Sequence, residues 1–134
     1  MSLYDQVREL PLVVERYALE GLEYVISPEF TRKSTVIRLE GAGEEGSGED
    51  VTYDAPEHDA QQTRGPVLPL AGEWTVETFS RHLDELPLFE HEPERHAYVD
   101  YRRWAFESAA LDLGLRQAGL SLGDAVGREA GPHV

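Results

Sequence analysis

A helix with two apolar faces, predicted from about Trp104 to Ala118, constrains the fold of this chain more than any other feature. Residues three or four apart share one face of a helix, and a surface helix needs only one apolar stripe. Apolar and small side chains fill two rows here: Trp104, Ser108, Leu111, Leu115 and Ala118 in one, and Phe106, Ala109, Ala110 and Leu113 in the other. Because a small domain has one core, we expect a packing partner on each side of this helix.

The composition is that of a soluble globular domain. The 134 residues suit one domain of ordinary size, and the 40% hydrophobic content is too high for a disordered chain. No apolar run approaches the ~20 residues of a membrane-spanning helix, and the first residues lack the pattern of a signal peptide. The absence of cysteine excludes disulfides and thiolate metal sites. We therefore expect a cytoplasmic protein that does not contact membranes.

The charge of the chain argues against nucleic acid as a partner. Twelve basic residues against 26 acidic ones give a net charge of -14, which repels a phosphate backbone. Two pairs, Arg32-Lys33 and Arg102-Arg103, are the strongest basic candidates, and both lie among carboxylates. No nucleic-acid-binding surface is predicted.

Three strands are expected in the first half of the chain. Residues from Tyr17 to Ile26 alternate in polarity, Ser34 to Glu40 is rich in β-branched residues, and Glu49 to Tyr53 is a third β-prone run. Gly21 interrupts the first alternation, which indicates either a β-bulge or a close neighbour. The three runs together predict an antiparallel meander.

Helices are expected in the second half. Thr75 can cap a helix from Val76 to about Leu86. A further helical region begins near Glu94, with a break near Asp100, and continues into the two-faced helix, which Gly119 can end in a left-handed conformation. The order of strands first and helices afterwards predicts an α+β domain: a three-stranded antiparallel meander followed by a small bundle of about three to four helices.

The predicted domain has five parts. The polar segment between strands and helices contains Pro56, Pro66 and Pro69 without clear periodicity, so it is either a functional loop or a flexible linker. A short helix from Leu3 to Glu9 looks like an addition to the core. The parts are an N-terminal extension (1–13), the meander (14–54), the loop (55–74), the helical part (75–127) and the start of a linker (128–134).

Three patterns could carry chemistry, and each has a plainer interpretation. The glycines from Gly41 to Gly46 match GxGxxG, but a dinucleotide site needs a helix after the loop, so a hairpin turn is favoured. The five histidines contain no HxxxH pair, so no histidine metal site is expected. Asp112 interrupts the apolar helix, and Arg116 is its nearest partner, which favours a structural role over a catalytic one.

Two stretches together resemble the N-terminal capping domain of the enolase superfamily, in its mandelate racemase and muconate lactonizing enzyme branch. The first, STVIRLEGAGEEGSGEDVTY, is similar to the pattern T-x-V-x-L-x-G-x-G-x-x-G-x-G-E. The second, AFESAALDLGLRQAGLSLGDAVG, is similar to A-x-x-x-A-x-x-D-L-x-x-x-x-x-G-x-x-L-x-x-x-x-G. The resemblance covers about Val14 to Gly127 and implies an enolase N-terminal domain-like fold.

The resemblance implies one part of a two-domain lyase or isomerase, in which this cap folds over a (β/α)-type barrel. In that superfamily the barrel holds an essential Mg²⁺ and the Lys or His bases that remove a proton α to a carboxylate. The reaction would be of the dehydratase, epimerase or racemase, or cycloisomerase type. The chain stops where a first barrel strand would begin, so we expect no catalytic residue, no metal ligand and no cofactor in it, and no activity of this piece alone.

The resemblance also implies that two segments of the cap contact the distal end of a small carboxylate substrate. They are the loop from Ser27 to Lys33 and the segment from Asp50 to Tyr53. Phe30 and Tyr53 could form apolar walls, and Arg32 or Lys33 could pair with the substrate anion; alternatively, these two cations are ordinary surface charges. The candidate substrate-contacting residues are Glu29, Phe30, Thr31, Arg32, Lys33, Val51, Thr52 and Tyr53.

A second function, from a different class, stays open. The chain could be a free-standing, non-catalytic binding or oligomerisation module that uses the apolar helix as its partner surface. The partner is then a protein surface, with a homo-oligomer as one form. In the first case the partner is the C-terminal barrel domain of the same enzyme.

Overall fold

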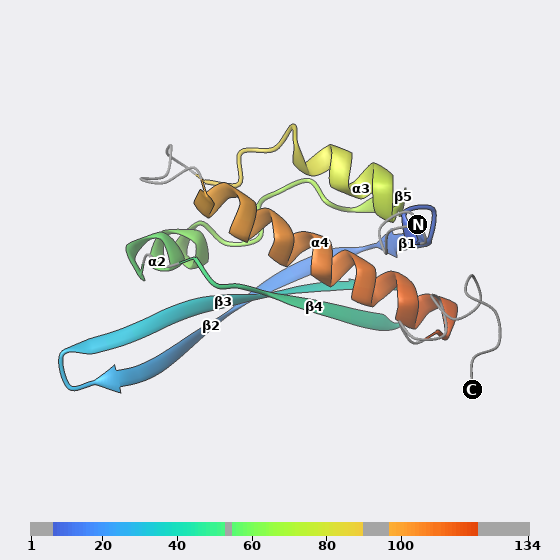
Figure 1. The fold of residues 1–134 in the computed structure, drawn as a ribbon. Helices are drawn as coiled ribbons and strands as arrows, with labels where there is room; N and C mark the ends of the chain where they lie inside the picture. Colours follow the sequence, from blue (N-terminus) through green and yellow to red (C-terminus); the bar gives the residue numbers. More distant parts are fainter. Residues whose placement is uncertain (1–6, 53–54, 90–96, 121–134) are drawn as a thin grey trace.

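The structure, a computed structural model, describes residues 7–52, 55–89 and 97–120. A three-stranded antiparallel sheet in the order β2-β3-β4 carries helix α4 on one face, and α4 lies between the sheet and helix α3 (Figure 1). The α+β meander with a small helical layer is therefore confirmed. The elements are β1 (Pro11–Val14), β2 (Arg16–Ser27), β3 (Phe30–Gly41), β4 (Glu44–Asp50), α2 (Ala55–Arg64), β5 (Gly72–Thr75), α3 (Val76–Leu83) and α4 (Ala97–Ala118).

Strands β2 and β3 form a long hairpin that contains the first two predicted strands. The hairpin turns at residues 28–29, so the predicted loop from Ser27 to Lys33 is too long: its second half continues the ladder as β3. The register shifts between Val25 and Ser27 and is regular at Gly21. A Cβ on Gly21 would lie 2.5 Å from the side-chain oxygen of Gln62, so this glycine accommodates a close neighbour.

Strand β4 begins earlier than predicted, at Glu44, and ends at Asp50, so the predicted run from Glu49 to Tyr53 is wrong. The glycines explain the error because they have low strand propensity. A Cβ on Gly46 would lie 2.3 Å from the backbone nitrogen of Leu113, and one on Gly48 would lie 2.1 Å from the carbonyl oxygen of Ala105. These glycines therefore let α4 lie directly on the strand.

The turn between β3 and β4 is the hairpin that the glycine pattern favoured over a dinucleotide site. Ala42 and Gly43 both have positive φ, at 49° and 80°, as a tight two-residue hairpin turn requires. Strand β4 follows the turn, and no helix is there to receive a phosphate.

The segment 55–74, predicted to be a loop, instead contains helix α2 and strand β5. Helix α2 has the sequence APEHDAQQTR, and its buried residues are His58 and Gln61. The core side of this helix is therefore polar, so the apolar periodicity from which a helix is predicted does not exist.

The predicted N-terminal extension also contributes to the fold. Strand β1 pairs antiparallel with β5, with Leu12 opposite Trp74. The side chains of Leu12 and Val14 lie in the core, so residues 11–13 belong to the domain. The predicted helix from Leu3 to Glu9 lies mostly outside the described residues, as does the predicted linker 128–134.

Helix α3 begins where the sequence indicates, whereas the predicted start of the last helix near Glu94 lies outside the described residues. Thr75 caps α3 through a reciprocal pair of hydrogen bonds with Thr78, and α3 ends at Leu83, before the predicted Leu86. Helix α4 continues through Asp100 without the expected break. Gly119, at φ 70°, ends it, and the amide of Leu120 donates to the carbonyl of Leu115 at 2.9 Å. None of the helices in the described ranges is long and apolar enough to cross a membrane.

The two apolar rows of α4 have different surroundings. The row of Phe106, Ala109, Ala110 and Leu113 is fully buried in the core. In the other row Leu115 is buried and Leu111 is half-buried, but Trp104 is 56% exposed and Ser108 and Ala118 are exposed. One face is therefore buried as expected, and the described part of the chain covers only part of the other.

Candidate functional site

The two segments predicted to contact a substrate lie side by side. The Arg32 guanidinium, on β3, donates from Nη2 to the carbonyl oxygen of Val51 at 3.2 Å, just beyond the end of β4. Glu29 lies in the hairpin turn, and Phe30, Thr31, Arg32 and Lys33 lie on β3 and not on a loop. Tyr53 is outside the described residues.

The tip of the β2–β3 hairpin is apolar and exposed. Four side chains there are between 44% and 76% exposed: Tyr24, Val25, Ile26 and Phe30. In Figure 1 the hairpin, in blue and cyan, extends well beyond the helices. The sequence pointed to Phe30 but not to the other three residues, because alternation in a strand indicates one buried face and gives no sign that both faces are open.

Lys33, the only lysine in the chain, is held by carboxylates. Its ammonium nitrogen lies 2.9 Å from Asp59 Oδ1, on α2, and 3.7 Å from Glu23 Oε1, on β2. The hydrogen bond to Asp59 raises the pKa of the Lys33 ammonium. This cation is therefore already paired within the chain, as expected for an ordinary surface charge and less suited to a substrate anion.

Thr52 points into the protein and is fully buried. Its backbone N–H and its hydroxyl both donate to Asp50 Oδ1, at 3.1 and 2.6 Å. Its carbonyl accepts a hydrogen bond from His58 Nε2 at 2.8 Å. The side chain of Thr52 therefore shapes the segment from within, while Val51 next to it is exposed.

A buried ion pair joins this segment to α4. Arg102 Nε lies 2.6 Å from Asp50 Oδ2, and the two side chains are only 2% and 0% exposed. The ring of Phe89 lies 3.8 Å from the guanidinium carbon. From the sequence, Arg102 stood out only as half of a basic pair, although its spacing of four and seven residues from Phe106 and Ala109 places it on the buried face.

His58 is a buried link between the sheet and the segment after β4. Its Nδ1 lies 2.8 Å from the hydroxyl of Thr35, and its Nε2 lies 2.8 Å from the carbonyl oxygen of Thr52. Because a carbonyl only accepts, we assign the proton to Nε2, so that Nδ1 accepts from Thr35. Both ring nitrogens are occupied, and within the described ranges no group of His, Asp or Glu could hold a metal ion.

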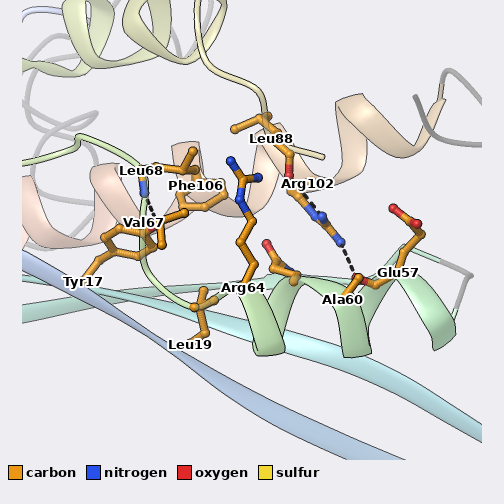
Figure 2. A pocket seen from close by; sticks show the side chains of 12 residues that line it. Tyr17, Leu19, Glu57, Ala60, Arg64, Val67, Leu68, Leu88, Arg102 and Phe106 are labelled. Carbon is orange, nitrogen blue, oxygen red and sulfur yellow. Dashed lines mark hydrogen bonds between the residues drawn. The ribbon is translucent and has the colours of Figure 1, made fainter. Parts of the chain in front are cut away.

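The cavity in Figure 2 is too small for an organic substrate. It lies between α2, β2, residues 65–68 and α4, and its volume is about 20 Å³, which holds roughly one water molecule. The amide of Leu68 donates to the Tyr17 hydroxyl at 2.8 Å across its rim. Arg64 and Arg102 also line it, but both donate to backbone carbonyls, of Pro87 and Leu88. An organic substrate therefore cannot bind in this cavity.

Asp112 has the partner expected from the sequence. The Arg116 guanidinium donates to Asp112 Oδ1 at 3.0 Å, and the backbone amide of Ser47 donates to its other oxygen at 3.0 Å. Asp112 thus attaches α4 to the outer edge of β4, which is a structural role.

Comparison with known families identifies the group to which the chain is related. Residues 5–125 match a family described as the N-terminal domain of a domain of unknown function, DUF8230. The chain belongs to this family. Comparisons with curated proteins and with solved structures find no match. The DUF8230 description names no ligand, so a functional argument has to come from the surface and the packing.

Proposed function

We propose that this domain is the N-terminal cap of a Mg²⁺-dependent enzyme of the enolase superfamily, which removes a proton α to a carboxylate. The catalytic barrel, with the metal and the bases, would lie outside these residues. The reaction would be a dehydration, an epimerisation or racemisation, or a cycloisomerisation, in the cytoplasm. Supplied by the barrel, Mg²⁺ would stabilise the enolate, and the cap would contact the substrate and exclude water.

The packing between the two resembling stretches supports this proposal. Gly46 and Gly48 belong to the first stretch, and they lie against Ala105, Ala109 and Leu113 of the second. Small residues on both sides are needed for a helix to lie this close to a strand. The two motifs are therefore one packing unit, which explains why they occur together.

The observation that most supports the proposal is the exposed tip of the β2–β3 hairpin. Tyr24, Val25, Ile26 and Phe30 lie exposed at the end of the hairpin, and the described cavity is too small for a substrate. Exposed apolar groups clustered at one end mark a contact surface. A cap that closes over a site on another domain requires such a surface.

The test compares the 134-residue chain with the protein encoded by the same reading frame continued past Val134. Both are incubated with Mg²⁺ in D₂O and a panel of sugar acids and other α-substituted carboxylates, and exchange of the α-proton is followed by NMR. We expect Mg²⁺-dependent exchange by the longer protein only. Exchange by the 134 residues alone, or a reading frame that stops at Val134, would refute the cap function.

Variants of the longer protein test the role of the tip. Phe30→Ala should raise KM by about tenfold, the effect of losing one buried apolar contact. Val67→Ala is the matched control, because Val67 is equally exposed but lies on the segment after α2, away from the tip. Equal kinetics for both variants would contradict contact between the tip and the substrate.

Oligomerisation through α4 is the second candidate function, and one observation favours it. Trp104 is largely exposed, and its ring centroid lies 5.8 Å from that of Tyr101, one turn earlier. Exposed tryptophan side chains are typical of protein–protein contact surfaces. Under this proposal the chain would self-associate in the absence of any barrel.

A further inference from the structure

We propose that Arg102 is a positioning residue, which acts through Asp50 to fix the segment after β4, and so sets the edge that the cap presents to its substrate. We call the Arg102–Asp50 ion pair and its hydrogen bonds the clamp. Its role towards a substrate rests on the proposed function.

Arg102 connects three separate segments. Its Nε donates to Asp50 Oδ2 at 2.6 Å, its Nη1 to the carbonyl of Leu88 at 3.1 Å, and its Nη2 to the carbonyl of Glu57 at 3.4 Å. Leu88 lies in the connection from α3 to α4, and Glu57 lies in the first turn of α2. One side chain of α4 therefore holds the end of β4, the start of α2 and the segment before α4 together.

Asp50, held by Arg102, in turn fixes the residues that follow it. Its Oδ1 accepts from the N–H and the hydroxyl of Thr52, a turn held by a side chain two residues back. Its Oδ2 accepts from Arg102 and, at 3.3 Å, from Gln61 Nε2. Because every acceptor position of the carboxylate is used, moving Asp50 would move Thr52, and with it Val51 at the surface.

The energetics of burial indicate that the pair determines geometry more than net stability. Removing two charges from water offsets most of their attraction, so well-packed apolar residues often replace a buried pair without loss of stability. An apolar pair, however, cannot accept from Thr52 or donate to the carbonyls of Leu88 and Glu57. Only the charged pair can therefore hold the segment after β4 in position.

The first test uses the 134-residue chain with Asp50→Leu and Arg102→Met combined. We expect the melting temperature to stay close to that of the wild type. Amide hydrogen exchange at Thr52, whose N–H donates to Asp50, should accelerate by about 10- to 100-fold, equivalent to one charge-assisted hydrogen bond. Unchanged exchange there, or acceleration spread evenly over the sheet and α4, would overturn the proposal.

Three single variants keep the test decisive even if the double variant does not fold. Arg102→Lys keeps a charge near Asp50 but cannot span to Leu88 and Glu57, so it should show the same local acceleration. Asp50→Asn keeps an acceptor for Thr52 but loses the ion pair with Arg102, so it should accelerate exchange at Thr52 less than the double variant does. Arg103→Met, next on the helix and paired with Asp84 and Glu107, is the control and should leave Thr52 unaffected.

The second test measures the role towards a substrate in the longer protein, with the carboxylate that it turns over. Arg102→Lys should raise KM by about tenfold or more with kcat within about twofold, and Asp50→Asn should raise KM by a smaller factor, because it keeps an acceptor for Thr52. An equal loss of kcat at unchanged KM would reject the positioning role. If no carboxylate is turned over at all, the proposed function fails, and the exchange experiment still decides the clamp.

Discussion

Gly48 of β4 lies directly against Ala105 of α4, so that a Cβ on Gly48 would be 2.1 Å from the Ala105 carbonyl oxygen. Real Cβ atoms do not approach a backbone oxygen so closely, and the neighbour here is helix backbone, which cannot rotate away. The distance between sheet and helix is thus determined by a residue without a side chain.

Gly48→Ala should therefore destabilise the chain by about 3 kcal/mol, because α4 would have to move off the sheet. Urea unfolding followed by circular dichroism measures this. Ser47→Ala, the next residue on the same strand with an exposed side chain, should change the free energy of unfolding by less than about 0.5 kcal/mol. Equal stability of the two variants would mean that α4 is not this close to β4.

The two rows of α4 should respond differently to truncation. Leu113→Ala removes a fully buried side chain and should cost about 2–5 kcal/mol. Trp104→Ser should change the free energy of unfolding by less than about 1 kcal/mol in the monomer, because this side chain is mostly exposed. Thermal and urea unfolding of both variants give the comparison.

Sedimentation velocity of the same Trp104→Ser variant separates the two candidate functions. If the chain is an oligomerisation module, the wild type should sediment as an oligomer at micromolar concentration and the variant as a monomer. Monomeric wild type over the whole concentration range would remove that alternative.

Stability should fall in alkaline solution partly because of Tyr17. Burial raises the pKa of its hydroxyl, opposed in part by the hydrogen bond from Leu68 and the charge of Arg64. With a folded pKa above the unfolded value, the unfolded state loses its proton first. The stabilisation that protonated Tyr17 gives the folded state is therefore fully present below about pH 10. It is lost as the pH rises through the folded pKa.

Tyr17→Phe should accordingly flatten the alkaline part of the stability curve. It should also cost about 1 kcal/mol at neutral pH, because the amide of Leu68 loses its acceptor. Tyr24→Phe, at the exposed hairpin tip, is the control for tyrosine content. Urea midpoints between about pH 8 and pH 11 test this prediction, and parallel curves for the wild type and Tyr17→Phe would contradict it.

Gly119→Ala should destabilise the end of α4 by about 1 kcal/mol, because its φ of 70° is strained for residues with a side chain. Gly119→Asn should cost less, since asparagine tolerates this conformation better. Apart from its chain neighbours, no atom of the described residues lies within 4 Å of a Cβ built on Gly119, so a loss of stability in thermal melts would report conformation and not a clash with them. No difference between glycine and alanine would show that the left-handed cap is not formed.

The elements with local signals could be predicted from the sequence. Alternation identified β2, β-branched residues identified the centre of β3, the capping threonine identified the start of α3, and Gly119 identified the end of α4. Helix α2 was missed because its buried residues, His58 and Gln61, are polar. Their burial depends on hydrogen bonds to Thr35, Thr52 and Asp50, which come from other parts of the chain.

Some residues of the candidate site could likewise be predicted from the sequence, and others could not. Phe30 and Val51 could be named from the sequence, as parts of the segments that the resemblance indicates. The sequence could not show that Lys33 is paired with Asp59, that Thr52 points inwards, or that Arg102 is buried against Asp50. Asp50 and Arg102 are 52 positions apart, and no local pattern connects them.

By itself, the sequence determined the fold class, the turn glycines, the helix caps and the two apolar rows of α4, because these depend on side chains a few positions apart. The tertiary structure decided which of the two apolar rows is covered, which glycines let α4 approach the sheet, and which charges are paired. The physical reason is that close packing and desolvation depend on neighbours brought together by folding, and these neighbours are distant along the chain.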